Sequence, residues 1–253
     1  MTSEASVLDH MLQEAERISQ HNFLGNFSVR TKSSATDFVT SVDTEIEASL
    51  TALLGKNFPE DGIVAEEGGV VERGRRSWVI DPLDGTSNFR RGRPNWSTSV
   101  ALRDQGDVIL AGVTEPLSNR RFLSAKGEGA WVSDVHGLRR ISVSSVSNLA
   151  DATGSTGFSN NLDFRRIQAR LMAEASMKVL DIRQYGSAVL DLCHVADGSQ
   201  DFYFEGGLKD WDLAAGSLII AEAGGVVWKT EGLTACSTPE LMRPLNEVIA
   251  SLG

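Results

Sequence analysis

Residues 78–89 have the sequence WVIDPLDGTSNF, and the interpretation of the whole chain starts from this stretch. Its apolar start predicts a buried strand that ends at Asp81, so that Asp81 and Asp84 enter a turn together. Gly85 permits a sharp bend, and Thr86 begins a predicted helix with free backbone N–H groups. Carboxylate oxygens suit hard cations, and N–H groups at a helix start suit phosphate. The stretch therefore predicts a metal-assisted phosphate site.

The same residues are compatible with other interpretations. A D-x-x-D-G segment is often only a polar turn. An EF-hand calcium loop is excluded because its last ligand is Glu, and a loop that starts at Asp81 has Gly92 in that place. A glycosidase pair is disfavoured, since two acids so close in sequence rarely flank a sugar ring. The choice depends on the rest of the chain.

Composition limits the class of protein. The chain has 253 residues, of which 41 % are hydrophobic, so it can bury one large core or two small ones. Lys+Arg 24 against Asp+Glu 34 gives a net charge of −10, which argues against a nucleic-acid partner. An anionic substrate would then need bound metal to invert the local field.

Cysteine content and the first residues indicate the compartment. Cys193 and Cys236 are the only cysteines, which fits a reducing compartment without a disulfide framework. Residues 1–17 carry several acids and do not resemble a signal peptide. No run of eighteen apolar residues occurs, so we expect no membrane partner and a soluble, cytoplasmic protein.

Periodicity predicts mixed α and β structure. Expected helices cover residues 8–18, 42–53, 164–175, 187–196 and 212–223, with none after them. Expected strands cover residues 63–65, 78–81, 97–102, 108–114, 121–125, 129–132, 177–182, 202–204 and 226–229. We expect an α+β subdomain at 1–140 that holds the metal site. An α/β subdomain at 141–253 would complete the substrate and metal site, with the seam within 142–161.

Three further acidic positions accompany the central stretch. Asp43 lies at a predicted helix start, Glu66-Glu67 follows a predicted strand, and Asp212 opens a predicted helix. Each alone is more often a helix cap or a solvated acid. Their joint placement at strand ends and helix starts, where α/β sheets build sites, favours a common centre.

Together these motifs resemble the inositol monophosphatase family, the lithium-sensitive, magnesium-dependent phosphatases related to fructose-1,6-bisphosphatase. The matching segments follow the family's order over nearly the whole chain: residues 32–43, 65–67, 78–89, 186–188 and 211–216. The turn at 81–89 is highly specific, and 211–216 is an independent match. The resemblance implies an α+β, layered α/β/α/β/α fold and a magnesium-dependent phosphoric monoester hydrolase that forms a homodimer.

The resemblance also implies a metal centre. Two or three Mg²⁺ ions would be bound by five residues: Glu66, Asp81, the Leu83 carbonyl, Asp84 and Asp212. The catalytic set would be Glu66, Thr86 and Asp43, with Thr86 orienting a water and Asp43 accepting its hydroxyl proton. Lys32 and Glu67 would lie at the edge of the cluster. In-line attack by a metal-activated water requires no protein nucleophile.

The implied substrate contacts lie on both sides of the phosphate. Backbone N–H groups at 85–87 would hold phosphate, and the alcohol would meet Gly186, Ser187, Ala188 and Glu205. The full implied set is Asp84, Gly85, Thr86, Ser87, Gly186, Ser187, Ala188, Glu205 and Asp212. The expected substrate is myo-inositol monophosphate; alternatives are histidinol phosphate, fructose 1,6-bisphosphate and adenosine 3',5'-bisphosphate. A regulatory, protein-binding role on the same fold is a second alternative.

The chain departs from the family pattern in two places. Lys209 stands where many inositol phosphatases have histidine. The loop RRGRPNW at 90–96 is unusually basic and aromatic. Its arginines, Arg90, Arg91 and Arg93, would contact a second anionic group or a partner subunit, or form a solvated surface run, which we favour.

Other hydrolase chemistries do not fit the sequence. A cysteine-nucleophile phosphatase needs Arg six residues after its Cys, and those positions hold Ser199 and Met242. An aspartyl nucleophile of the haloacid-dehalogenase type needs D-x-D-x-T/V, which residues 210–214 do not match. A zinc site or Ser-His-Asp triad is unsupported because the four histidines lie outside every motif: His10, His21, His136 and His194.

Overall fold

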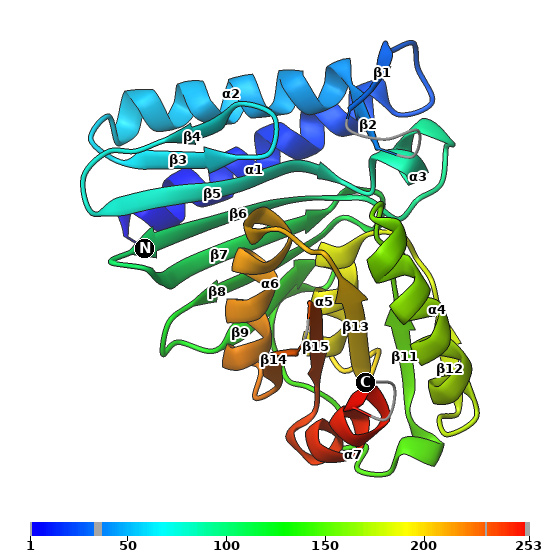
Figure 1. Cartoon of the computed structure of the whole chain (residues 1–253). Helices are drawn as coiled ribbons and strands as arrows, with labels where there is room; N and C mark the ends of the chain where they lie inside the picture. The colour runs from blue at the N-terminus through cyan, green and yellow to red at the C-terminus, as the bar shows by residue number, and fades with distance from the viewer. Residues whose placement is uncertain (1, 33–36, 231, 251–253) are drawn as a thin grey trace.

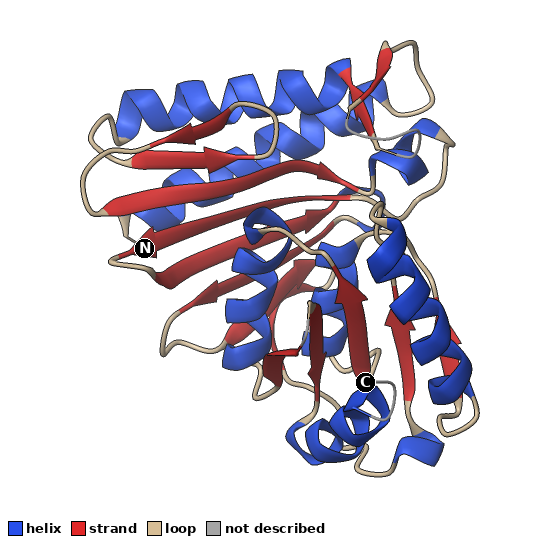
Figure 2. Ribbon diagram, in the orientation of Figure 1, coloured by secondary structure: helices blue, strands red, loops and turns tan. Residues whose placement is uncertain are grey.

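The chain folds into five stacked layers of helices and sheets (Figures 1 and 2). The computed structural model describes residues 2–32, 37–230 and 232–250. The layers are a helix pair, an eight-stranded sheet, a second helix pair, a five-stranded sheet and a third helix pair. This arrangement confirms the expected α/β/α/β/α fold.

The larger sheet carries the central stretch on its strand β5. Its strand order is β10-β9-β8-β7-β6-β5-β3-β4, and all neighbours are antiparallel except β3 and β5. The strands are β3 (Gly62–Ala65), β4 (Gly69–Val71), β5 (Arg76–Asp84), β6 (Ser97–Asp104), β7 (Asp107–Glu115), β8 (Arg120–Ala125), β9 (Ala130–Asp134) and β10 (Gly137–Ile141).

One face of this sheet is covered by α1 (Ser3–Asn22) and α2 (Ser41–Asn57). The apolar stripe of α1 is buried at every residue that its periodicity picks out: Leu8, Met11, Leu12, Ala15 and Ile18. Trp78 on β5 is fully buried, and its ring stacks on Phe58 just after α2 with centroids 5.6 Å apart. A small ribbon of β1 (Val29–Thr31) and β2 (Phe38–Thr40) leads into α2.

The opposite face packs on α5 (Ala188–Ala196) and α6 (Asp210–Glu222), which lie between the two sheets. The two helices approach closely at Gly216, where a Cβ would lie 2.6 Å from a methyl carbon of Leu192. Only glycine fits this contact without a shift of the helices.

The smaller sheet has the order β12-β11-β13-β15-β14. Its outer face packs against α4 (Leu162–Ser176) and α7 (Pro239–Ala250). The strands are β11 (Thr153–Thr156), β12 (Asp181–Arg183), β13 (Phe202–Gly206), β14 (Val226–Thr230) and β15 (Leu233–Ser237). The larger sheet ends at Ile141, just before the predicted seam at 142–161, whereas β11 of the smaller sheet begins at Thr153, inside that range.

Three expectations about elements are wrong. Strand β5 does not end at Asp81 but continues to Asp84 through an irregular stretch of pairing. The strand expected at 177–182 begins only at Asp181, because α4 extends to Ser176 and a turn follows. The helix at 210–222 is not the last one: α7 follows it, with its apolar stripe buried although Pro244 lies inside it.

Among the described residues, no helix is both long enough and apolar enough to cross a membrane.

Candidate active site

An irregularity in β5 places the first two carboxylates. Asp81 pairs with Ser99 of β6 and Asp84 with Ser97, so three steps on β5 oppose two on β6. Such a bulge re-aims side chains, and here it turns both Asp81 and Asp84 to the same side. Gly85 ends the strand with φ +89°, where a Cβ would lie 2.8 Å from the Asn95 carbonyl oxygen. Glycine is required at this turn.

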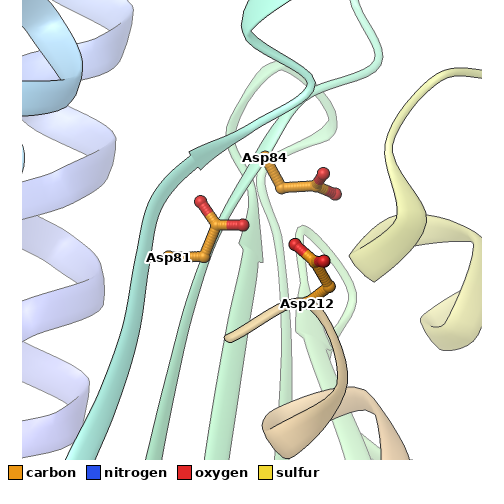
Figure 3. Close-up of side chains that lie close together, drawn as sticks. All are labelled: Asp81, Asp84 and Asp212. Carbon is orange, nitrogen blue, oxygen red and sulfur yellow. The ribbon is translucent and has the colours of Figure 1, made fainter. Parts of the chain in front are cut away.

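A third carboxylate, Asp212, comes from the first turn of α6. Its Oδ2 accepts a hydrogen bond of 2.5 Å from the Lys209 backbone N–H, which fixes the side chain at the helix start. One oxygen from each of Asp81, Asp84 and Asp212 lies within 4.8 Å of the others (Figure 3). The three side chains point toward one another across the gap between β5 and α6.

Burial and mutual repulsion disfavour the ionised form of these acids. Asp81 is 1 % exposed, and burial, followed by the charges of its acidic neighbours, raises its pKa well above the ordinary value. Burial, followed by the charge of Asp84, raises the pKa of Asp212 to about 7. A divalent cation would relieve this repulsion, and an all-oxygen donor set suits magnesium.

Asp84 is held by the start of α5. Its Oδ2 accepts hydrogen bonds from the Ser187 hydroxyl at 2.5 Å and from the Val189 backbone N–H at 2.8 Å. Ser187 is also the N-cap of α5 and is 1 % exposed. Its side chain is therefore directed at Asp84, and the expected contact between Ser187 and a substrate alcohol stays a prediction.

Glu66 and Leu83 lie beside the three aspartates and face the same cleft. Glu66 follows β3, and its Oε1 accepts a 2.7 Å hydrogen bond from Lys32 Nζ, which also contacts Glu67 Oε1 at 2.5 Å. Burial lowers the pKa of Lys32, but the hydrogen bonds and charges of the two glutamates outweigh it and raise that pKa. The rest of the matched segment 32–43 includes residues 33–36, which lie outside the described residues.

Thr86 connects the site to α2. Its Oγ1 lies 3.1 Å from Asp43 Oδ1 and 2.9 Å from the Leu83 carbonyl oxygen. Asp43 is the third residue of α2 and forms a capping box with Thr40, which explains why an acid is buried there. Burial, only partly offset by hydrogen bonds from Thr40, raises the pKa of Asp43 to about 6. Asp43 is thus mostly ionised at neutral pH and can accept a hydrogen bond from the Thr86 hydroxyl.

Glu66, the three aspartates and Thr86 line a cleft of about 1150 Å³. The cleft is also lined by most of the predicted substrate residues: Gly85, Thr86, Ser87, Gly186, Ala188 and Glu205. Glu205 Oε2 accepts a 2.5 Å hydrogen bond from the Tyr203 hydroxyl, and burial raises its pKa to about 8. A Cβ at Gly157 would lie 1.7 Å from Glu205 Oε2, so any larger residue there would displace the Glu205 carboxylate.

A model of the inositol monophosphatase family matches residues 4–251 of this chain. The chain belongs to this family. Inositol-1-monophosphatase of Mycobacterium leprae is 42 % identical over 209 residues, which cover 80 % of this chain and 72 % of that protein. Nus factor SuhB of Pasteurella multocida is 38 % identical over 235 residues, which cover 86 % of this chain and 85 % of that protein.

Solved structures of the family superpose closely. The extragenic suppressor protein suhB of Bartonella henselae matches with a TM-score of 0.92 and 29 % identity, over 98 % of each chain. The Thermotoga maritima IMPase matches with a TM-score of 0.88 and 31 % identity, over 98 % of this chain and 96 % of that one. The recognised family and its fold are therefore both confirmed.

The basic loop of this inositol monophosphatase family member does not line the cleft. Arg90 stacks on the Phe38 ring with its guanidinium carbon 4.0 Å from the ring centroid. Arg91 and Arg93 are exposed on the surface. For Arg91 and Arg93, a solvated surface run and a contact with a partner subunit both stay predictions, whereas Arg90 packs against the ribbon that precedes α2.

The family motifs leave out several residues that shape the cleft. Tyr203 holds Glu205 from two positions earlier on β13, and strand alternation would have placed both on one face. Arg165 on α4 lines the cleft because α4 packs across the smaller sheet. That placement is a long-range feature with no local sequence signal.

Neither the two cysteines nor His194 is placed to act as a nucleophile. Burial raises the pKa of both cysteine thiols, Cys193 and Cys236, which disfavours the reactive thiolate. His194 lies in α5 with Nε2 3.7 Å from Glu115 Oε1, and it does not line the cleft. Both observations agree with a reaction that needs no covalent intermediate.

Proposed function

We propose that this inositol monophosphatase family member is a magnesium-dependent phosphomonoesterase that acts on a small phosphorylated alcohol. The observation that carries the proposal is the convergence of Asp81, Asp84 and Asp212 at one end of a cleft large enough for such a substrate. Its relatives include proteins named inositol-1-monophosphatase, which supports the same reaction class.

Magnesium fits the donor set of this site. The residues that would hold two or three Mg²⁺ ions are the three aspartates, with Glu66 and the Leu83 carbonyl beside them. When bound, the metal supplies an activated water and neutralises charge on the leaving oxygen. To bind metal, Glu66 would have to give up the hydrogen bond that it accepts from Lys32. Lys32 would remain a cation at the edge of the site, because it also contacts Glu67.

Thr86 and Asp43 orient the attacking water in this proposal. The single hydroxyl proton of Thr86 is within reach of both Asp43 Oδ1 and the Leu83 carbonyl. If the Leu83 carbonyl held a metal ion, the Thr86 hydroxyl would donate its hydrogen bond to ionised Asp43 instead. The Thr86 oxygen then presents its lone pairs to a water in the cleft and fixes that water's direction of approach.

The substrate would lie along the cleft from Gly85 to Glu205. Backbone N–H groups at 85–87 would hold the phosphate, and the alcohol would meet Gly186, Ala188 and Glu205. We propose myo-inositol monophosphate as the first substrate to test. The alternatives are histidinol phosphate, fructose 1,6-bisphosphate and adenosine 3',5'-bisphosphate.

The test is phosphate release from these substrates by the purified protein. We expect activity that requires magnesium, is lost on addition of EDTA, falls with lithium, and collapses in Asp84→Asn. Asp107→Asn, an exposed acid paired only with exposed Lys126, is the matched control and should keep full activity. Activity that survives EDTA would refute the metal mechanism.

A second candidate is a regulatory, protein-binding role on the same fold. It is supported by relatives at 38–40 % identity that are named Nus factor SuhB. A cellular effect that persists in the inactive Asp84→Asn variant would favour this role, and one that disappears would favour catalysis. We further propose a cytoplasmic homodimer whose subdomains, 1–140 and 141–253, both contribute to the site through β5 and α6.

A further inference from the structure

The cleft continues well beyond the metal corner. Ligand sites for small molecules occupy roughly 300–1000 Å³, and this cleft of about 1150 Å³ exceeds the upper end of that range. Its outer part is formed by residues 157–165, which lead from β11 into α4, and by residues 206–209 before α6. Figure 1 shows α4 beginning at the end of the molecule where β5 leads into α3 (Thr86–Arg90). The outer part therefore faces the same opening as the metal corner.

A fixed guanidinium lines this outer part. Arg165 is half-buried in the first turn of α4, and its Nε donates a 2.9 Å hydrogen bond to the Ser159 carbonyl oxygen. That bond sets the plane of the group while its two terminal amino groups stay available as donors. Within the described chain no carboxylate lies within 4.0 Å of Arg165, whereas the neighbouring Arg166 pairs with Asp163 at 2.8 Å. Arginine in such a setting matches the paired oxygens of phosphate or carboxylate.

A second cation that lines this cleft lies just before α6. Lys209 is exposed at the start of α6 and lines both the cleft and a neighbouring groove. The groove is lined by another lysine, Lys229 of β14. The cleft also holds acids besides the metal ligands, Asp37 and Glu205, and Glu205 is engaged by Tyr203. In a chain of net charge −10, cations gathered around one end of the cleft form a local exception.

We propose that the outer cleft, at Arg165 and Lys209, binds a second anionic group of the substrate. The preferred substrate is then a small phosphorylated alcohol that carries a further carboxylate or phosphate. This inference rests on the proposed phosphomonoesterase function and specifies its substrate class. The hydrolysed phosphate occupies the metal corner, and the second anion stays bound by hydrogen bonds and charge without reacting.

The test compares substrates that differ only in the second charge. Glycerol 2-phosphate and 2-phosphoglycerate share the hydrolysed group and differ by a hydroxymethyl against a carboxylate. Inositol 1-phosphate and inositol 1,4-bisphosphate extend the comparison to a phosphate at longer reach. We expect wild-type kcat/KM to be about ten-fold or more higher for the more anionic member of at least one pair, because charge-assisted pairs are the stronger hydrogen bonds.

Matched variants locate the effect. Arg165→Gln should reduce that preference about ten-fold and Lys209→Gln several-fold, mainly through KM, because each removes a positive charge from the second-anion site. The Lys209 charge also acts on Asp212, so the ratio of kcat/KM within a substrate pair, and not the rate itself, measures its effect on the second anion. Arg170→Gln is the control, because Arg170 is exposed on the same helix and does not line the cleft. Lys209→Gln retains the backbone N–H that binds Asp212.

Two outcomes would overturn the inference. Equal rates within both pairs, or the same preference in Arg165→Gln and Arg170→Gln, would refute the anion subsite and leave the phosphomonoesterase intact. Failure to release phosphate from every substrate with magnesium present would refute the proposed function, and the subsite with it.

Discussion

The inner and outer ends of the cleft are built in different ways. At the inner end, Asp81 is buried, Asp84 and Asp212 are half-buried, and backbone N–H groups or helix caps fix Asp84 and Asp212. At the outer end, Arg165 is half-buried and fixed by one carbonyl, and Lys209 is exposed. The inner end is therefore suited to a geometry that tolerates little change, as metal chemistry requires. The outer end is suited to substrate selection, and substitutions there should reduce activity only moderately.

The most severe test of this contrast is Asp81→Asn. Removing one ligand should lower kcat/KM by about 10³-fold or more, since metal-centred charge stabilisation is usually the largest catalytic contribution. The metal-free protein should nevertheless melt at a higher temperature, because the substitution removes a carboxyl group whose ionised form is disfavoured by burial and by the charges of four neighbouring carboxylates. Thermal unfolding with and without magnesium measures both effects. A lower metal-free Tm would contradict our description of the inner end.

The Thr86–Asp43 pair should give the next largest effect. Asp43 must be ionised to accept the Thr86 proton, and its pKa is raised to about 6. Activity should therefore fall as pH decreases through about 6, because protonation removes the acceptor. Asp43→Asn should lower kcat by about 10²-fold and abolish this acidic limb. The pH profile of kcat measures it, and an acidic limb that remains in Asp43→Asn would assign it to another group.

Gly157→Ala probes the middle of the cleft. The added methyl group would collide with the Glu205 carboxylate, which is itself tied to Tyr203. We expect KM for a polyol phosphate to rise about ten-fold, with little change in the magnesium requirement. Gly55→Ala in α2 is the control, because a methyl group there meets nothing within 4 Å. An equal change in the magnesium requirement would show that the two ends of the cleft are not independent.

Ser187→Ala should have the smallest effect. It removes one of the hydrogen bonds to Asp84 and the N-cap of α5, but the Val189 N–H remains. Loss of such a supporting contact should raise the magnesium concentration for half-maximal activity about ten-fold, at a stability cost of about 1 kcal/mol. Thr2→Ala, the N-cap of α1, has a similar stability cost without touching the site. A change in substrate KM instead of magnesium dependence would return Ser187 to substrate binding.

The sequence predicts the inner end far better than the outer one. Asp81, Asp84 and Thr86 lie within one short segment, so local turn chemistry and a family motif identify them together. Asp212 and Asp43 occupy the third position of a helix, where an acid also acts as a cap, and this dual role makes them visible. The direction of Ser187 toward Asp84 was not visible, because it depends on how α5 meets β5.

The elements that sequence periodicity missed are those that depend on tertiary packing. The bulge in β5 depends on pairing with β6, which no local pattern encodes. Pro244 interrupts the helical signal of α7, yet Leu241, Leu245 and Val248 still bury one apolar face of that helix. Arg165 became part of the cleft only through the packing of α4. The substrate preference that we propose for Arg165 is correspondingly difficult to predict from motifs.

The close approach of α5 and α6 at Gly216 links two carboxylates that no hydrogen bond joins. The start of α5 holds Asp84, and the start of α6 carries Asp212. The contact between Gly216 and Leu192 therefore sets the distance between the two carboxylates that would bind a cation. A larger residue at 216 would move the two helices apart, and the distance between Asp84 and Asp212 would increase. Substitutions in the apolar core can therefore change the affinity for the ion in related sequences while every ligand stays the same.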